Sequence, residues 1–429
     1  MASPPGAVAE ALRAEPGRLA WAVRNPLAGG YRASTPRFGF LAEFLAGDSQ
    51  DVHGHEAIFL GVGQQSGALF GAVVHSTRRG QAQGGVRRWQ YPSLETFVRD
   101  GLRLAQAMTR KNALAHLWWG GGKGLIACDA GAHVEDPSFR RALYREYGSF
   151  VSALRGCYVT AEDVGTRPDD MAEIATTTRF ATCLPADRGG RGDPSTMTAA
   201  GVARAIDAAL AFRGEQSVAG LRVAVQGGGN TGSALVAELL ARDAGRIVVA
   251  ERSSERCERL RAVWTGRPVD VRHATPGDAT ILAEACDVLA PCALGSVLDA
   301  TTIPEIKARI VCGSANNPLA DDDRDAARLA ERNITFVPDV VANRMGIVYV
   351  CNEQYGSLDD DDELTRHLDG DWEGGVFATT LRVLEDARTR GITPQAAALE
   401  RADALAEHEH PIFGHRGWRI VEGLCRATG

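Results

Sequence analysis

The chain has 429 residues, of which 45% are hydrophobic and 24% are charged, and its formal net charge is −7. This length exceeds what one hydrophobic core usually supports, so we expect two domains. The negative charge and the lack of a basic block argue against a nucleic-acid partner. No apolar run is long enough to span a membrane and no signal peptide is recognisable, which favours a cytoplasmic protein. Its nine cysteines contain no C-x-x-C pair and are expected to be free thiols, and no metal site is predicted.

The N-terminal third of the chain begins without a clear pattern. Residues 1–35 are rich in Ala, Pro, Gly and Arg, and we expect a loose extension with room for one helix. The apolar segments 57–61 and 67–75 predict paired strands, joined by a turn at 64–67.

A helix is predicted over residues 94–112, where Ser93 is a suitable N-cap. Apolar residues recur in it at helical spacing and form one stripe, namely Val98, Leu102, Ala105 and Met108. This helix carries Lys111 near its C-terminal end. Short strands are expected at 125–128 and 158–161.

From about residue 194 the pattern alternates between helix and strand. A helix over 198–212 precedes a buried strand over 221–226, a glycine turn and a second helix that ends near 242. Further strands are expected at 246–250, 287–290, 310–312 and 335–337, and further helices at 376–390 and 394–407. Such alternation predicts an α/β fold with a parallel, doubly wound sheet.

The glycine turn is the first candidate for a ligand site. Gly227, Gly229 and Gly232 match G-x-G-x-x-G between a strand and a helix, the setting in which backbone N–H groups bind a pyrophosphate. Glu251 ends the next strand and is suited to bind ribose hydroxyls, which favours NAD. Arg252 and Ser253 follow directly and are suited to a 2′-phosphate, so NADP stays open. A glycine turn without a ligand is the competing explanation.

Two lysines, Lys111 and Lys123, lie twelve residues apart in a glycine-rich segment of a chain that otherwise prefers arginine. Residues 120–124 lack the spacing of a phosphate-binding loop. If both amines line one cleft, each disfavours protonation of the other, so one can act as a base while the other binds a carboxylate. Ordinary surface lysines are the alternative.

Three polar residues follow predicted strands at positions suited to catalysis. Asp163 could exchange protons beside Lys123, or it could only stabilise a turn. Asn316 and Asn343 each follow a strand end, where parallel sheets bind ligands, although asparagine is also a common turn residue.

Nine short motifs occur together in one order between about residues 55 and 410. They span residues 84–87, 108–113, 120–123, 160–166, 194–201, 227–230, 290–295, 313–317 and 338–343. In these motifs the chain resembles the glutamate/leucine/phenylalanine/valine dehydrogenases, and the leucine and phenylalanine branch most.

The resemblance implies two domains and a reaction. A substrate and oligomerisation domain, with a mixed sheet and C-terminal helices, would comprise residues 36–192 and 349–429, and an inserted Rossmann domain residues 193–348. The reaction would be reversible NAD(P)-dependent oxidative deamination of an L-amino acid to a 2-oxo acid and ammonia. The protein would be a homo-oligomer.

The resemblance also implies roles for single residues. Lys111 would hold the substrate carboxylate, Lys123 would activate water, and Asp163 would exchange protons with the amine. The other substrate-binding residues would be Gln83, Gly84, Gly85, Asn343, Glu373 and Val376. Thr198 would orient the nicotinamide, and the rest of the cofactor site would comprise Gly227, Gly229, Asn230, Thr231, Gly232, Glu251, Arg252, Ala290 and Asn316.

Several positions depart from the family pattern. Gln83 stands where leucine-type enzymes carry an apolar residue, and Glu373 falls where an aliphatic pocket residue is expected. A polar group buried unpaired against an aliphatic ligand costs about 1–3 kcal/mol, so we predict a polar or non-standard substrate side chain. The bulky pairs at 118–119 and 344–345 leave two alternatives open: a catalytically silent NAD(P)-binding regulator whose cleft is narrowed, and a specialised imine reductase.

Overall fold

The computed structural model describes the chain except residues 26, 129–135, 294, 357, 359 and 428–429. It divides into two compact units. Unit 1 comprises Met1–Asp193, Val350–Ser357 and Asp403–Gly429, and unit 2 comprises Pro194–Tyr349 and Leu358–Ala402. None of the helices in the described residues is long and apolar enough to cross a membrane.

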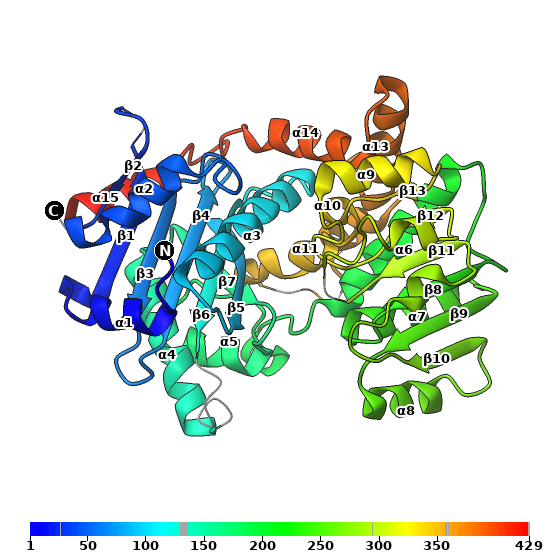
Figure 1. The fold of residues 1–429 in the computed structure, drawn as a ribbon, viewed down its shortest axis with the longest axis horizontal. Coiled ribbons are helices and arrows are strands. Elements are labelled where there is room, and N and C mark those ends of the chain that lie inside the picture. The colour runs from blue at the N-terminus through cyan, green and yellow to red at the C-terminus, as the bar shows by residue number, and fades with distance from the viewer. Residues whose placement is uncertain (26, 129–135, 294, 357, 359, 428–429) are drawn as a thin grey trace. The chain divides into compact units, whose positions relative to one another are not determined.

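Unit 1 is built on a seven-stranded mixed sheet in the order β2-β1-β3-β4-β6-β5-β7 (Figure 1). The strands are β1 (Leu19–Arg24), β2 (Tyr31–Ala33), β3 (Ala57–Val62), β4 (Leu69–Ser76), β5 (Ala82–Trp89), β6 (Gly120–Ala127) and β7 (Tyr158–Glu162). Neighbours from β2 to β6 are antiparallel, whereas β5 runs parallel to both β6 and β7. The predicted mixed sheet and the predicted β3–β4 pair are confirmed.

Helices cover both faces of this sheet. They are α1 (Pro5–Arg13), α2 (Gly39–Gly47), α3 (Leu94–Leu114), α4 (Pro137–Ala153), α5 (Pro168–Ala175) and α15 (Arg416–Ala427). The apolar stripe of α3 is buried against one face, and Ser93 caps the helix as predicted, accepting from Thr96 N at 3.2 Å. Phe150 and Tyr147 of α4 pack on the opposite face.

The N-terminal region is not the loose extension that composition predicted. Residues 5–13 form the one predicted helix, and Leu12 on it is fully buried. Residues 19–24 form β1, which pairs with β3 and contributes Ala20, Ala22 and Val23 to the interior. The apolar run is only five residues long, and it becomes a strand because β3 supplies its hydrogen bonds.

The strand predicted after Gly124 begins earlier, at Gly120, so the glycine run lies inside β6. Each glycine here meets a close neighbour. A Cβ at Gly121 would lie 2.2 Å from Thr109 N, and one at Gly124 would lie 2.2 Å from Tyr147 Oη. These glycines therefore allow α3 and the tyrosines to approach the sheet closely, a role that the sequence did not indicate.

Unit 2 holds a six-stranded sheet in the order β10-β9-β8-β11-β12-β13, and all of its strand pairs are parallel. The strands are β8 (Arg222–Gln226), β9 (Arg246–Glu251), β10 (Val269–His273), β11 (Val288–Pro291), β12 (Ile310–Val311) and β13 (Thr335–Phe336). The predicted doubly wound sheet is confirmed. Its order reverses direction at β8, the position where such sheets bind ligands.

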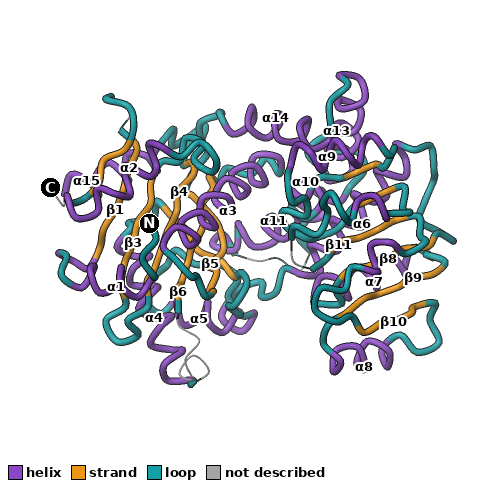
Figure 2. Tube along the Cα trace, viewed as in Figure 1, coloured by secondary structure: helices purple, strands orange, loops and turns teal. Residues whose placement is uncertain are grey.

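The helices of unit 2 complete this fold, and Figure 2 distinguishes them from the strands and loops. They are α6 (Ser195–Phe212), α7 (Asn230–Ala241), α8 (Ser254–Val263), α9 (Asp322–Glu331), α10 (Asp339–Ala342), α11 (Met345–Cys351), α12 (Asp362–Thr365), α13 (Val376–Arg390) and α14 (Pro394–Ala406). The last residues of α11 and α14 fall within unit 1. Short 3₁₀ turns occupy Pro16–Arg18, Pro36–Phe38, Ala186–Arg188, Thr280–Ala283, Ile303–Glu305, Glu353–Tyr355 and Arg366–Leu368.

The division of the C-terminal region differs from the predicted one. Residues 349–429 were expected to join the substrate domain, but Leu358–Ala402 belongs to unit 2. The reason is that α13 packs against α6 and buries Val376, Val383 and Leu384. Only residues 350–357 and the segment from Asp403, with α15, join unit 1.

Candidate active site

A buried ion pair joins Lys123 and Asp163 in unit 1. Lys123 projects from β6 and Asp163 follows the end of β7, and Nζ lies 2.7 Å from Oδ2. The Lys123 side chain is only 4% exposed. Burial lowers the pKa of the Lys123 amine, although the charge of Asp163 opposes this effect. An amine whose pKa is lowered can accept and release protons nearer neutral pH than a surface lysine can.

Arg87 on β5 is a second cation bound to Asp163. Its Nε donates to Asp163 Oδ2 at 3.0 Å. Burial acts to raise the pKa of Asp163, but Lys123 and Arg87 outweigh it and lower that pKa to about 2. The carboxylate is therefore ionised throughout the neutral range.

Sequence reasoning gave Arg87 no role, although it lies in a recognised motif. A second nitrogen of the Arg87 guanidinium, Nη1, donates to both carboxylate oxygens of Asp100 on α3, at 3.0 and 3.2 Å. Tyr91 Oη donates to the same carboxylate at 2.7 Å. Arg87 thereby fixes the orientation of Asp163, because a guanidinium shared by two carboxylates has few alternative positions. The sequence feature that could have identified Arg87 is its position two residues after the Gly84–Gly85 pair.

The predicted substrate residues of β5 lie next to this ion pair. A Cβ at Gly85 would lie 2.8 Å from Asp163 Cβ, and one at Gly84 would lie 1.8 Å from Gly122 O. Both positions therefore require glycine for the strand to fit between β6 and β7. Gln83 is fully buried, and neither its amide nitrogen nor its amide oxygen has a hydrogen-bond partner among the described residues.

Lys111 lies near the C-terminal end of α3 and is 8% exposed, so neither lysine is an ordinary surface residue. The helix end is tied to the start of β6, because Asn112 Nδ2 donates to Gly120 O at 2.6 Å. The two lysines therefore project from elements that pack directly on one another.

The glycine turn of unit 2 runs from the end of β8 into α7. Gly227 has a φ of +97°, which a glycine adopts without strain, and a Cβ at Gly232 would lie 1.9 Å from Gly227 O. By contrast, a Cβ at Gly229 would meet only Arg256 Nη1, at 3.5 Å. The fold does not need a glycine at 229, whereas close approach of a pyrophosphate would. Asn230 and Thr231 begin α7 immediately after it.

Glu251 at the end of β9 holds the same turn in place. It is buried, and its two carboxylate oxygens accept from Gly228 N at 2.9 Å and from Ser253 N at 2.8 Å. Each oxygen keeps a further lone pair for a ligand hydroxyl. Ser253 Oγ caps α8 by accepting from Arg256 N, and its O–H is still able to donate to a ligand. Arg252 is exposed beside them.

The structure brings two of the predicted asparagines together. Asn343 Nδ2 donates to Asn316 Oδ1 at 3.0 Å and to Ser314 O at 3.1 Å. Asn343 Oδ1 is buried and has no hydrogen-bond partner among the described residues, which leaves an acceptor for a ligand. Thr198 donates to Pro194 O near the start of α6, and Ala290 is buried in β11.

Two residues expected beside the substrate differ in burial. Val376 is fully buried at the start of α13. The Glu373 side chain is 75% exposed and lies 3.8 Å from Arg382. The role of Glu373 beside the substrate stays a prediction.

Three of the four bulky substitutions, Trp119, Arg344 and Met345, are accommodated inside their own units, whereas Trp118 is 42% exposed. Arg344 is fully buried, and its guanidinium contacts Gly374 O and Thr379 Oγ1. Met345 is also buried and packs against Gly201. In unit 1, Trp119 donates to Asn352 Oδ1 at 3.2 Å. These contacts remove the main reason for proposing a catalytically silent regulator.

Comparisons with known proteins identify the family of this chain. The dimerisation domain of the Glu/Leu/Phe/Val dehydrogenases matches residues 68–180, and the Glutamate/Leucine/Phenylalanine/Valine dehydrogenase domain matches residues 257–400. The chain is 36% identical to a leucine dehydrogenase of Bacillus cereus, a match that covers 83% of this chain and 91% of that one. It is also 36% identical to the valine dehydrogenase of Streptomyces virginiae, over 83% and 94% of the two chains.

A solved structure is also similar. The crystal structure of L-tryptophan dehydrogenase from Nostoc punctiforme has a TM-score of 0.65 and 30% sequence identity to this chain. The match covers 82% of this chain and 96% of that one.

Proposed function

Because this chain belongs to the Glu/Leu/Phe/Val dehydrogenase family and is an amino acid dehydrogenase, we propose that Lys123 and Asp163 catalyse proton transfer in reversible oxidative deamination of an L-amino acid. The buried Lys123–Asp163 contact of 2.7 Å is the observation that supports this assignment. Lys123 activates the water that attacks the imine carbon, and Asp163 exchanges protons with the substrate nitrogen.

The remaining residues bind and orient the substrate. Lys111 binds the substrate carboxylate as a point charge. Asn343 offers its unpaired Oδ1 as an acceptor for the substrate ammonium group. When bound, a nicotinamide cofactor would supply the acceptor for the hydride that leaves the substrate carbon. The glycine turn and the N-terminus of α7 bind its pyrophosphate, and Thr198, Ala290 and Asn316 line its nicotinamide side.

We infer that NAD is the preferred cofactor. Glu251 is buried and held by two backbone N–H groups, so a cofactor with a 2′-phosphate would bring a second negative charge to it. Arg252 is the residue that would favour NADP, and measuring turnover with both cofactors tests this preference.

The preferred amino acid is proposed to carry a polar or non-standard side chain. Gln83 is the reason, since its fully buried amide lacks a partner in the described part of the chain. A substrate with its own donor or acceptor would satisfy that amide, whereas an aliphatic substrate would not. A panel of amino acids assayed by nicotinamide absorbance tests the idea. Highest turnover with leucine or valine would contradict it.

We further propose a cytoplasmic homo-oligomer. All nine cysteines are free, which fits a reducing compartment. The matched dimerisation domain spans β4 to β7 and therefore includes both catalytic residues. Light scattering of the purified chain tests the assembly.

A further inference from the structure

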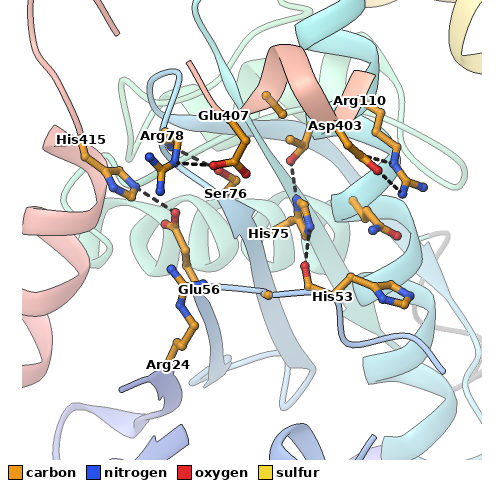
Figure 3. Close-up of a pocket in the computed structure, with 14 residues that line it drawn as sticks. Arg24, His53, Glu56, His75, Ser76, Arg78, Arg110, Asp403, Glu407 and His415 are labelled. Carbon is orange, nitrogen blue, oxygen red and sulfur yellow. Dashed lines mark hydrogen bonds and ion pairs between the residues drawn. The ribbon is translucent and has the colours of Figure 1, made fainter. Parts of the chain in front are cut away.

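A cavity of about 310 Å³ lies in unit 1, outside the residues assigned to the substrate and cofactor. Its wall combines the end of β1, the loop before β3, the end of β4, one side of α3 and the segment from Asp403 to His415 (Figure 3). Its size is at the lower end of the range for small-molecule sites. The cavity therefore suits a small metabolite and not a dinucleotide.

Two of the acids in the wall already have donors. Asp403 accepts from Arg110 through both carboxylate oxygens, at 2.8 and 2.9 Å. Glu56 accepts from Thr77 N and Thr77 Oγ1 at 2.8 and 2.6 Å, and from His415 Nε2 at 3.0 Å. Neither acid requires a further cation.

Arg24, in contrast, makes no ion-pair contact with an acid among the described residues. Its Nε is shielded from solvent and has no hydrogen-bond partner in the described ranges. The residue is nevertheless well placed, because its backbone N donates to Glu56 O at 2.9 Å and its guanidinium lies 5.7 Å from the ring centre of Trp418. Figure 3 shows Arg24 beside Glu56 and His415 on one side of the cavity.

A second arginine in the wall is paired loosely. Arg78 lies 3.6 Å from Glu407 and 3.4 Å from Glu409, whose side chains are 74% and 53% exposed. Exposed pairs of this length contribute little, so an incoming anion can replace them.

The histidine in the middle of the wall adds no charge. His75 Nε2 lies 3.0 Å from His53 O and Nδ1 lies 2.8 Å from Thr109 Oγ1, so both ring nitrogens have partners. Burial, with smaller effects from nearby charges, lowers the pKa of His75 to about 3, and the ring is neutral at physiological pH. The wall's three arginines are matched in number by its three acids, Glu56, Asp403 and Glu407, so an anion would be bound by the free donors of individual guanidinium groups and not by a net charge.

We propose that this cavity binds a small organic oxyanion, a metabolite with a carboxylate or phosphate group, which is held by Arg24 and Arg78. A guanidinium is suited to both groups because it donates two parallel hydrogen bonds to adjacent oxygens. His415 borders the same space, but its Nε2 already contacts Glu56 Oε1 at 3.0 Å.

The cavity is connected to the proposed substrate site through α3. Thr109 and Arg110 line it and immediately precede Lys111. Thr109 packs directly on β6, because its N is 2.2 Å from where a Cβ of Gly121 would lie, so a displacement of α3 by a bound anion alters this contact. An anion in the cavity therefore changes the position of Lys111 relative to β6, and with it the affinity for the amino acid. This second step rests on the role of Lys111 proposed above.

Binding is tested on the full chain by calorimetry with sodium phosphate and sodium malonate, against sodium chloride at equal ionic strength. We expect saturable binding of one or both probes, and the tighter one identifies the head group. Arg24→Met should weaken it about tenfold or more, as expected for the loss of a charged hydrogen bond. Arg32→Met is the matched control, since Arg32 lies on the same hairpin, stacks on Trp21 at 5.2 Å and is not part of the cavity wall.

Equal binding by Arg24→Met and the unmodified chain would place the anion elsewhere and overturn the site. Lack of saturable binding of either probe would also overturn the site. This includes the case in which a partner subunit fills the cavity. Should Arg24→Met not fold, Arg78→Met replaces it, with a smaller expected loss. The connection to catalysis is tested by the KM for the amino acid, which should change with the bound probe in the unmodified chain and in Arg32→Met. Binding without any change in KM would overturn the connection but not the site, and neither result depends on the assignment of Lys123.

Discussion

The two glycine-rich segments of this chain use the same residue for different purposes. In β6, Thr109 and Tyr147 occupy the space where side chains at positions 121 and 124 would lie. Glycine at these two positions therefore allows close packing of the helices on the sheet. In the turn after β8, Gly229 faces only the end of an arginine side chain, at 3.5 Å. A glycine with free space around its Cα, such as Gly229, indicates that a ligand approaches the backbone there. A glycine whose Cα is closely surrounded by other residues indicates a requirement of domain packing.

Lys123 lies in the same strand as these closely packed glycines, but we propose a catalytic role for it. Lys123→Met should lower kcat roughly 100- to 10,000-fold, the range for loss of a general acid–base group. Its aliphatic stem is kept, so the melting temperature should change little. Steady-state kinetics measures the loss, and cofactor binding by calorimetry should be retained. Near-normal turnover would remove Lys123 from the mechanism.

Gly121→Ala tests the packing role. The added methyl would lie 2.1 Å from Thr109 Oγ1 and 2.2 Å from Thr109 N, so α3 has to move. We expect a loss of about 1–3 kcal/mol in the free energy of unfolding, the cost of overpacking a core. Urea denaturation measures it. An unchanged midpoint would show that helix and strand separate more easily than their contacts indicate.

Gly229→Ala is the matched change in the turn. Its φ of −64° is allowed for alanine, and no described atom lies closer than 3.5 Å to the new methyl. Stability should therefore stay within about 0.5 kcal/mol of the unmodified chain, as for a surface substitution. The Kd for NAD should rise about tenfold, because the methyl occupies space needed by the pyrophosphate. Unaltered NAD affinity would contradict the ligand explanation for this glycine.

The smallest expected effect concerns Glu162, which precedes Asp163. Burial, together with Asp193, Asp163 and Asp170, raises the pKa of Glu162 from 4.5 to about 7. The folded chain thus holds this proton more tightly than the unfolded chain, and stability falls as the pH rises from 4.5 to 7. Glu162→Gln removes this dependence, so its melting temperature should exceed that of the unmodified chain above pH 7 and match it below pH 4.5.

Melting curves at both ends of this range measure the difference. The exposed Glu385 provides the control, and Glu385→Gln should leave the pH dependence unchanged. If the melting temperatures of Glu162→Gln and the unmodified chain changed in parallel with pH, the Glu162 carboxyl would be better solvated than its position indicates.

The sequence by itself determined the features that depend on neighbouring residues. The stripe and cap of α3, the β3–β4 pair and the strand–glycine–helix unit around Gly227 follow from local backbone preferences and periodicity. The same patterns selected Lys111, Lys123 and Asp163 as candidate site residues, each at the end of, or within, a regular element, but the burial of the two lysines was known only from the structure.

Only the tertiary structure showed which residues far apart in the sequence contact one another. The role of Arg87 depends on Asp100 and Asp163, which other elements supply. The strand β1 forms because β3 lies beside it, and Glu56 in the cavity wall is hydrogen-bonded by Thr77 and by His415, which lies 359 residues further along the chain. Such pairings are set by the energy of burying charge and apolar surface together, which no local pattern in the chain records.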